Sequence, residues 1–292
     1  MDLPDALLDN LNMVHDDADL WLEALPETLA DLEARWELRV TGLVPLLSYN
    51  LVLYAERPDE TPCILKLSPP TPDLAREGEA LRYYDGDGIC RLLERDDNVS
   101  ALLLERVLPG LSLQEVWTYE IDAEHTRIAA KLMQRLWRPV LKPHPFRSMT
   151  SWARALEHVS GADDLREKAR DLLREYLSNE DVVLLHGDLH HGNILSAKTE
   201  PYRAIDPKGV VGPKGFDIGM YLLNPVGVRA TDLIALLPTR LAIFSEVLEL
   251  ETRDLAAWGF VQAVLSSCWT AEGGGAHSEE TLEVARALEG YI

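Results

Sequence analysis

The pattern of apolar positions changes along the first part of the chain. From 16 to 37 these positions recur at helical spacing, and we expect this helix to break and restart at Pro26, since proline suits the first helical position. Short apolar runs bounded by polar turns follow, which is the pattern of antiparallel strands. The expected strands cover 38–44, 50–55, 63–67, 91–94 and 101–107. A helix at 73–85 interrupts them.

The later part of the chain has mostly helical spacing. The expected helices cover 122–137, 151–158, 163–177, 216–223, 231–248, 253–270 and 279–288. Pro109-Gly110 marks a boundary between the two parts, and 292 residues exceed one ordinary domain. The sequence therefore predicts an α+β chain of two lobes: a 1–107 N-lobe with a small antiparallel β-sheet and a mainly helical 108–292 C-lobe.

Three oxygen-bearing side chains lie on loops where short strands end. The apolar run at 182–185 has the pattern of a buried strand. It leads into 186–193, which is too rich in glycine and polar residues to continue the strand. Asp188 and Asn193 lie in this loop, and Asp206 follows a second short apolar run.

These three side chains match the needs of phosphoryl transfer from a nucleotide. One carboxylate has to accept the proton of the attacking hydroxyl, and oxygen ligands have to hold Mg²⁺ against the phosphates. Asp188 and Asn193 have the D-x-x-x-x-N spacing of a kinase catalytic loop, and Asp206 falls where a metal-binding aspartate would follow. We therefore predict Asp188 as the catalytic residue and Asn193 and Asp206 as Mg²⁺ ligands. A lone loop aspartate usually forms a turn or cap, but three matches at this spacing rarely coincide.

The stretches LLHGDLHHGNIL and AIDPKGVVG closely resemble the aminoglycoside phosphotransferases, especially their streptomycin 6-kinase and hydroxyurea-kinase branch. The resemblance extends from about Trp36 to Glu272. It implies a bilobal, protein-kinase-like fold. It also implies ATP-dependent phosphorylation of a hydroxyl group on a small molecule, an aminoglycoside such as streptomycin, and hence antibiotic inactivation. A small-molecule kinase with a non-antibiotic acceptor remains an alternative, because the residues that carry the chemistry do not specify the acceptor.

Lys66 is a single charge inside the apolar strand expected at 63–67. Burying an ammonium group without a partner is expensive, so we expect Lys66 to contact the nucleotide phosphates and a helix carboxylate. Helical spacing turns Glu77 inward and makes it the expected partner. The alternative is an edge-strand lysine that faces water.

The resemblance implies two further contacts with the nucleotide. In a kinase-like N-lobe, the turn at 45–50 would cover the phosphates. It contains no G-x-G-x-x-G motif, and backbone N–H groups from Ser48 onward would hold phosphate there. The last strand would lead to a hinge, where the backbone near Glu105 and Val107 would bind the edge of the adenine.

The resemblance also places the acceptor near the end of the helix expected at 253–270. Glu272 would pair with a cationic group and Trp269 would supply a stacking wall, although an ordinary helix end with a core tryptophan fits the sequence equally well. His190 follows Asp188 by two residues, where many protein kinases carry a phosphate-contacting lysine. We include it as a candidate substrate contact, with a solvated loop position as the alternative.

Two more polar residues are expected to support this region. His186 precedes Gly-Asp, where it would brace the loop backbone. Asp217 lies just before an apolar helix, so it would cap that helix or tie down the catalytic loop.

The composition of the chain limits the classes of molecule that we expect it to bind. The net charge is −21, and both nucleic acid and anionic membranes need a basic surface, so we exclude them and expect a cationic small-molecule substrate. Solubility alone is an equally open reason for the charge. No apolar run approaches the ~20 residues of a membrane span, and the N-terminus lacks the basic segment of a secretory signal. Three scattered cysteines suit reduced thiols, so we expect a cytoplasmic protein.

Two other functions fit parts of the sequence. His186, Asp188, His190 and His191 form an H-x-D-x-H-H run that can bind zinc or iron in a hydrolase. That reading leaves Lys66 without a role. A nucleotide-binding protein without catalysis is the third hypothesis, and the complete set of charged catalytic residues argues against it.

Overall fold

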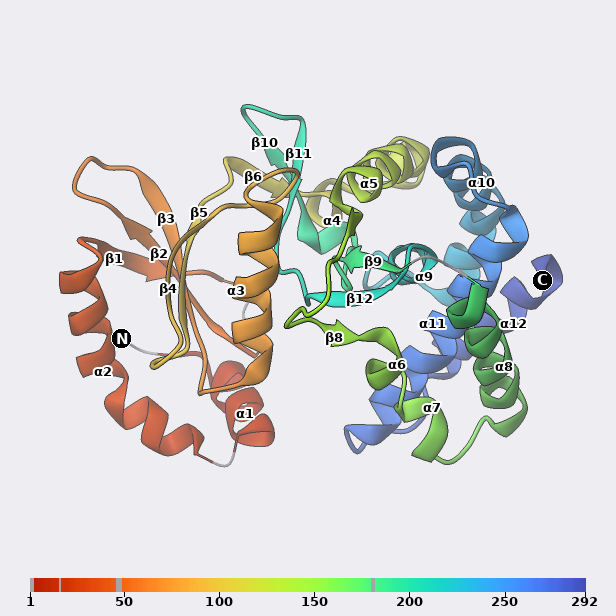
Figure 1. The fold of residues 1–292 in the computed structure, drawn as a ribbon, viewed down its shortest axis with the longest axis horizontal. Helices are drawn as coiled ribbons and strands as arrows, with labels where there is room; N and C mark the ends of the chain where they lie inside the picture. Colours follow the sequence, from red (N-terminus) through yellow and green to blue (C-terminus); the bar gives the residue numbers. More distant parts are fainter. Residues whose placement is uncertain (1–2, 16, 46–48, 180–181) are drawn as a thin grey trace. The chain divides into compact units, whose positions relative to one another are not determined.

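A computed structural model gives the structure of the chain and describes residues 3–15, 17–45, 49–179 and 182–292. The chain divides into two compact units, which we call unit 1 (Met1–Val107) and unit 2 (Leu108–Ile292). Unit 1 contains a five-stranded sheet and its helices, and unit 2 contains two smaller sheets among many helices (Figure 1). The α+β class predicted from the sequence is confirmed.

Unit 1 is built around an antiparallel sheet with the strand order β1-β2-β3-β5-β4. Its elements are α1 (Asp5–Val14), α2 (Ala18–Arg35), β1 (Arg39–Leu43), β2 (Leu51–Glu56), β3 (Pro62–Leu67), α3 (Pro72–Tyr84), β4 (Leu92–Asp96) and β5 (Ala101–Glu105). All five expected strands are present, and their ends differ from expectation by at most two residues. Helix α1 was not expected.

The two faces of this sheet have different neighbours. One face forms a core with leucines of α1 and α2, and it contributes Leu51, Leu53, Ala55, Leu65 and Leu67. Side chains alternate between the faces of a strand, so Lys66 points to the opposite face, the one that α3 covers (Figure 1). The alternation along β3 thus turns a lysine toward a helix and away from the leucine core.

The expected break at Pro26 is wrong. Helix α2 continues through this proline without interruption. Pro26 is exposed, while Leu25 and Leu32, on either side of it, are buried in the core of unit 1. Packing of one leucine face along the whole helix therefore outweighs the backbone hydrogen bond that proline removes.

Unit 2 contains two small sheets with the strand orders β11-β10-β6 and β7-β9-β12-β8. Its strands are β6 (Pro109–Ser112), β7 (Arg138–Pro139), β8 (Arg147–Ser148), β9 (Val182–Leu185), β10 (Ile194–Ala197), β11 (Tyr202–Ala204) and β12 (Val210–Pro213). Its helices are α4 (Leu113–Val116), η1 (Tyr119–Ile121), α5 (Asp122–Leu136), α6 (Met149–Trp152), α7 (Ala155–His158), α8 (Asp163–Asn179), η2 (His191–Asn193), α9 (Gly215–Leu222), α10 (Ala230–Leu248), α11 (Thr252–Glu272), α12 (Glu279–Leu288) and η3 (Glu289–Tyr291). Within the described part of the chain, no helix combines the length and the apolar character that crossing a membrane requires.

Helix α9 packs very closely on the buried helix α11. A Cβ atom at Gly219 would lie 2.7 Å from the carbonyl oxygen of Trp258, and one at Gly215 would lie 1.9 Å from the Trp258 ring. Only glycine permits this approach. The contact fixes α9 against the core, and α9 carries Asp217 in its first turn.

Candidate active site

The loop after β9 carries the predicted catalytic aspartate. The chain turns at Gly187, whose φ of +84° suits glycine. A Cβ atom there would lie 3.1 Å from the ring of Trp152, so the turn is also closely packed. Asp188 follows, with a side chain that is 23% exposed. The turn therefore presents the Asp188 carboxylate at the surface of unit 2.

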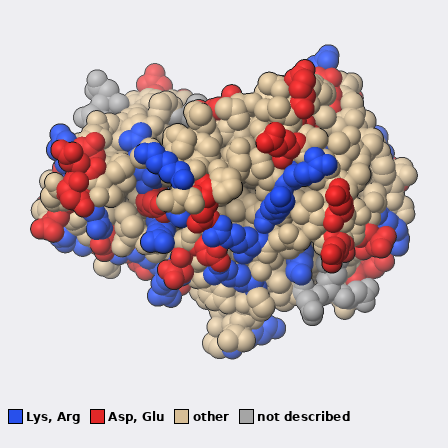
Figure 2. Space-filling view, turned by 90° about the horizontal axis from the view of Figure 1, so that it is seen from above, with Lys and Arg blue, Asp and Glu red and all other residues tan. Residues whose placement is uncertain are grey.

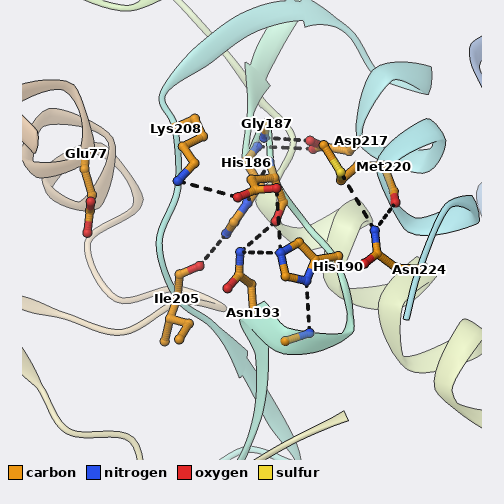
Figure 3. A network of polar contacts seen from close by, with 12 residues as sticks. Glu77, His186, Gly187, His190, Asn193, Ile205, Lys208, Asp217, Met220 and Asn224 are labelled. Atoms are coloured by element: carbon orange, nitrogen blue, oxygen red, sulfur yellow. Dashed lines mark hydrogen bonds and ion pairs between the residues drawn. The ribbon is translucent and has the colours of Figure 1, made fainter. Parts of the chain in front are cut away.

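Asp217 holds this turn from the buried side. Its carboxylate accepts hydrogen bonds from the backbone N–H groups of Gly187 (2.7 Å) and His186 (3.1 Å) (Figure 3). The indole N–H of Trp137 also donates to it, at 3.1 Å. Burial raises the pKa of Asp217 to about 6, even though these three donors favour the charged form. Of the two roles that the sequence left open, Asp217 ties down the catalytic loop.

His186 braces the loop, as expected from the sequence. Its Nδ1 accepts a hydrogen bond from the backbone N–H of Asp188 at 3.2 Å. The proton of the neutral ring is therefore on Nε2, which donates to the carbonyl oxygen of Ile205 at 2.8 Å (Figure 3). Burial lowers the pKa of His186 to about 3, so the ring is neutral at neutral pH.

Asn193 turns its side chain back onto the loop. Its Nδ2 donates to the carbonyl oxygen of Asp188 at 2.9 Å, which leaves Oδ1 as the end of the amide that can bind a cation. His190 accepts a hydrogen bond from the backbone N–H of Gly192 through Nδ1 at 3.0 Å. Burial lowers the pKa of His190. This histidine is part of the loop's own hydrogen bonding, and its contact with substrate stays a prediction.

Asp206 lies in a segment that is hydrogen-bonded to the same loop on both sides. Before it, the N–H of Ile205 donates to the carbonyl oxygen of Asn193 at 3.0 Å. After it, the N–H of Lys208 donates to the carbonyl oxygen of His186 at 2.7 Å. Asp206 has a φ of +61°, which is uncommon for a residue with a side chain, although aspartate adopts it more readily than most. The structure thus brings the segments of the two predicted Mg²⁺ ligands together.

Lys208 is a basic neighbour of Asp188 that is not among the residues expected from the sequence. Its Nζ lies 3.5 Å from Oδ2 of Asp188, and Nε2 of His190 lies 3.7 Å from Oδ1. The only signal in the sequence is its place two residues after Asp206, within the AIDPKGVVG stretch. Spacing alone does not bring Lys208 to Asp188; the hydrogen bonds between the two loops do.

Unit 1 contains the expected ion pair. Nζ of Lys66 on β3 lies 2.8 Å from both carboxylate oxygens of Glu77 on α3. Lys66 is 2% exposed and Glu77 is 5% exposed. Removing two charges from water costs about as much as their attraction returns, so a buried pair of this kind is weak evidence for stability. A contact of Lys66 with the nucleotide phosphates stays a prediction.

Three more residues were predicted to contact the nucleotide, and the structure describes two of them. Glu105 ends β5, and its N–H donates to the carbonyl oxygen of Arg91 at 2.9 Å. Its side chain accepts from the N–H of Arg91 at 3.2 Å. Val107 is buried, and Ser48 lies outside the described residues. Contact of any of these three with a nucleotide stays a prediction.

Two aromatic rings connect the predicted acceptor residues with the catalytic turn. The rings of Trp269 and Trp152 have centroids 5.3 Å apart, and the Trp152 ring packs on Gly187. Glu272 is exposed at the end of α11, where it pairs with His158 at 2.7 Å. Trp152 and His158 were not among the expected site residues. One helix was expected at 151–158, and the structure instead has the two short helices α6 and α7 there, which bring these side chains to Trp269 and Glu272.

The metal site proposed on His186, Asp188, His190 and His191 is not formed. Among the described residues, no three His, Cys, Asp or Glu side chains lie where they could share a metal ion. His186 uses both ring nitrogens within the loop, and His191 stacks on Tyr221 with ring centroids 4.2 Å apart. The described residues therefore do not form the metal site that the hydrolase hypothesis needs, since His186 braces the loop and His191 packs on an aromatic ring.

Comparison with known proteins identifies the family of the chain. Residues 35–274 match the sequence model of the aminoglycoside/hydroxyurea antibiotic resistance kinases. The chain is 33% identical over 284 residues to streptomycin 6-kinase of Streptomyces glaucescens, covering 93% of this chain and 91% of that protein. It is 34% identical over 283 residues to hydroxyurea phosphotransferase of Kitasatospora aureofaciens, covering 92% of this chain and 80% of that protein.

The fold is also similar to that of solved structures. An amicoumacin kinase in complex with AMP-PNP and Ca²⁺ matches with a TM-score of 0.58 and 14% identity, over 95% of each chain. This likeness concerns the fold alone, and it confirms the protein-kinase-like architecture expected from the sequence. The family match spans more than half of the chain, and the sequence relatives align over most of it. The chain therefore belongs to the family of aminoglycoside/hydroxyurea antibiotic resistance kinases.

Proposed function

We propose that this enzyme transfers the γ-phosphoryl group of ATP to a hydroxyl group of an aminoglycoside antibiotic, with a streptomycin-like molecule as the first candidate. The observation that carries the proposal is the Asp188 turn. Asp217 and His186 hold the turn from inside unit 2, and they leave the Asp188 carboxylate accessible. A carboxylate held in this way can receive the proton of an acceptor hydroxyl.

Asp188 would orient the acceptor hydroxyl and take its proton. The hydroxyl oxygen forms a bond to the γ-phosphorus while the bond from that phosphorus to the β,γ-bridging oxygen breaks, and ADP is released. Positioning and charge neutralisation supply most of the rate in such a reaction. The hydrogen bonds around Asp188 fit this need, because they fix the backbone on both sides of the carboxylate.

The residues present fit a magnesium ion. Mg²⁺ prefers oxygen ligands and is commonly held by one or two protein groups together with substrate phosphates. Oδ1 of Asn193 and the carboxylate of Asp206 would supply those groups, since the Asn193 amide nitrogen is already used as a donor to Asp188. When bound, the ion would neutralise charge on the phosphates.

Residues of unit 1 would bind the nucleotide. Lys66, held by Glu77, would contact the α- and β-phosphates. The backbone near Glu105 and Val107 would bind the adenine, and Ser48 would contribute a phosphate contact. These roles rest on the family resemblance and on the buried ion pair.

The acceptor is expected to be cationic. Glu272 would pair with a positively charged group, and Trp269, backed by Trp152, would form a wall beside it. Basic and acidic side chains are interspersed on the face drawn in Figure 2, and the net charge is −21. The net charge supports a cationic small molecule over nucleic acid. The use of ATP and the three buried free cysteines support a cytoplasmic location.

The experiment is an ATP-consumption assay over a panel of aminoglycosides with Mg²⁺ present, followed by mass spectrometry of the products. Hydroxyurea belongs in the panel, because one relative carries that activity in its name. We expect one added phosphoryl group on a streptomycin-like acceptor. The Asp188→Asn variant should still bind ATP while its turnover falls by about a thousandfold or more. Wild-type turnover in that variant would refute the role of Asp188, and phosphorylation of hydroxyurea alone would refute the aminoglycoside acceptor.

A further inference from the structure

The Asp188 carboxylate has one nitrogen group on each side. Nζ of Lys208 lies 3.5 Å from Oδ2, and Nε2 of His190 lies 3.7 Å from Oδ1. His190 uses Nδ1 to accept the N–H of Gly192, and a ring nitrogen that accepts a hydrogen bond carries no proton, so this ring has no positive charge. Lys208 is therefore the neighbour that brings a positive charge to Asp188.

The backbone of Lys208 is fixed while its side chain keeps some freedom. Its N–H donates to the carbonyl oxygen of His186 at 2.7 Å, which anchors the residue to the catalytic loop. Its side chain is 41% exposed. The 3.5 Å distance to Asp188 is longer than the ~2.7–2.9 Å of a tight charge-assisted hydrogen bond. The ammonium group is thus held near the carboxylate without being locked to it.

We propose that Lys208 is a catalytic residue that contacts both Asp188 and the phosphoryl group during transfer. The inference rests on the proposed function. Asp188 takes the proton from the same acceptor oxygen that forms the new bond to phosphorus. A cation beside the Asp188 carboxylate is therefore within reach of the γ-phosphate oxygens.

The two negative charges beside the acceptor oxygen favour a cation that contacts both of them. The Asp188 carboxylate and the γ-phosphate both carry negative charge, and the reaction brings them to the two sides of one oxygen atom. An ammonium group that contacts both offsets their repulsion, and it stabilises the charge on the phosphoryl oxygens while the leaving group departs. Lys208 follows Asp206 by two residues, so one segment supplies a proposed Mg²⁺ ligand and this cation.

The test compares nucleotides with and without a γ-phosphate. Calorimetry would measure the binding of Mg²⁺·AMP-PNP and Mg²⁺·ADP to the full chain and to Lys208→Met and Lys208→Arg. Lys198→Met, which removes an exposed lysine from the turn between β10 and β11, is the matched control. Thermal unfolding of each variant and turnover with the acceptor that the wild type uses complete the set.

We expect Lys208→Met to weaken AMP-PNP binding by about tenfold and ADP binding by less than about twofold. Its kcat should fall by about a hundredfold, the usual effect of removing one donor to transition-state charge. Lys208→Arg should recover a large part of both losses, and the control should behave as wild type. Equal losses for the two nucleotides in folded Lys208→Met would overturn the inference. If Lys208→Met does not fold, Lys208→Gln replaces it in the same comparison.

The same experiment separates this inference from the proposed function. A wild-type protein that does not bind AMP-PNP contradicts the proposed function itself. A wild-type protein that binds it, together with a Lys208→Met variant that keeps the wild-type preference for AMP-PNP over ADP, contradicts only the role of Lys208.

Discussion

The backbone N–H of Gly187 donates to the buried carboxylate of Asp217 at 2.7 Å, one residue before Asp188, the predicted catalytic residue. Asp217 stands on α9, which glycines allow to pack against α11. A continuous chain of close contacts therefore runs from the core of unit 2 to the surface carboxylate. The Asp188 carboxylate is partly exposed, but its position is set by buried groups.

Replacing Asp217 with Asn should lower kcat while leaving nucleotide affinity nearly unchanged. The amide keeps the size of the side chain, but its NH₂ group would face at least one of the three N–H donors that now bind the carboxylate. We expect a loss in kcat of about tenfold to a hundredfold, since the Asp188 turn would lose its fixed position. Steady-state kinetics would measure this, with Asp171→Asn on the exposed side of α8 as the control. An unchanged kcat would contradict the anchoring role.

The same variant tests the charge of Asp217. The folded-state pKa of about 6 lies above the ordinary value of 3.8, so the folded protein holds this proton more tightly than the unfolded chain does. The resulting stabilisation is complete below the ordinary value and is lost as the pH rises through about 6. Asparagine does not titrate, so the free energy of unfolding of the wild type should fall relative to Asp217→Asn by up to about 3 kcal/mol over this range. Urea unfolding of both proteins at several pH values would measure the difference. If their free energies of unfolding changed with pH by the same amount, the raised pKa of Asp217 would be contradicted.

Replacing Asp206 with Asn should raise the Mg²⁺ concentration needed for half-maximal activity. The amide keeps one oxygen ligand but loses the negative charge that attracts the cation, so we expect a shift of about tenfold or more. Turnover measured over a Mg²⁺ titration would show it. Asp232→Asn, in the first turn of α10, is the control for a simple loss of negative charge. A lower kcat at an unchanged Mg²⁺ requirement would argue that Asp206 acts otherwise than as a ligand.

The sequence predicted elements well where a periodic pattern extended over several residues. The strands of unit 1 and the long helices of unit 2 have enough positions to show their period, and the Lys66–Glu77 pair followed from placing two such patterns together. The two-residue strands β7 and β8 have no period to detect. The break expected at Pro26 failed because the leucine face on both sides of it buries into one core.

The candidate site also contains residues that the sequence could predict and residues that it could not. Asp188, Asn193 and Asp206 could be selected because their spacing is local and matches a known motif. Lys208 and Trp152 could not, because their places beside Asp188 and Gly187 depend on contacts between segments that are distant in the sequence. Local spacing thus selected candidate residues, whose chemical roles stay predictions, and tertiary contacts added the groups that surround them.

Lys66 and Glu77 allow a structural role to be separated from a functional one. Lys66→Met alone should destabilise unit 1 by about 3–5 kcal/mol, because it leaves the Glu77 carboxylate buried without its cation. Adding Glu77→Leu should restore most of that stability, since two apolar side chains replace the pair. If Lys66 binds phosphates, the stable double variant should still bind ATP at least about tenfold more weakly than the wild type. Unfolding curves and calorimetry would measure the two effects, and full recovery of ATP affinity would contradict the nucleotide role.

Glu272 should determine the affinity for a cationic acceptor and not the rate of transfer. Its carboxylate is exposed and pairs with His158 at 2.7 Å, so it is accessible to a charged ligand. Glu272→Gln should raise the KM for the acceptor by about tenfold, the value of one charge-assisted hydrogen bond, while the kcat and the KM for ATP stay within about twofold. Glu167→Gln, which removes an exposed carboxylate from α8, controls for the general loss of negative charge. His158→Gln sharpens the test, because it removes the imidazole that now contacts the Glu272 carboxylate. The acceptor KM should then fall or stay constant, and a rise in His158→Gln as large as that in Glu272→Gln would show that the pair is structural.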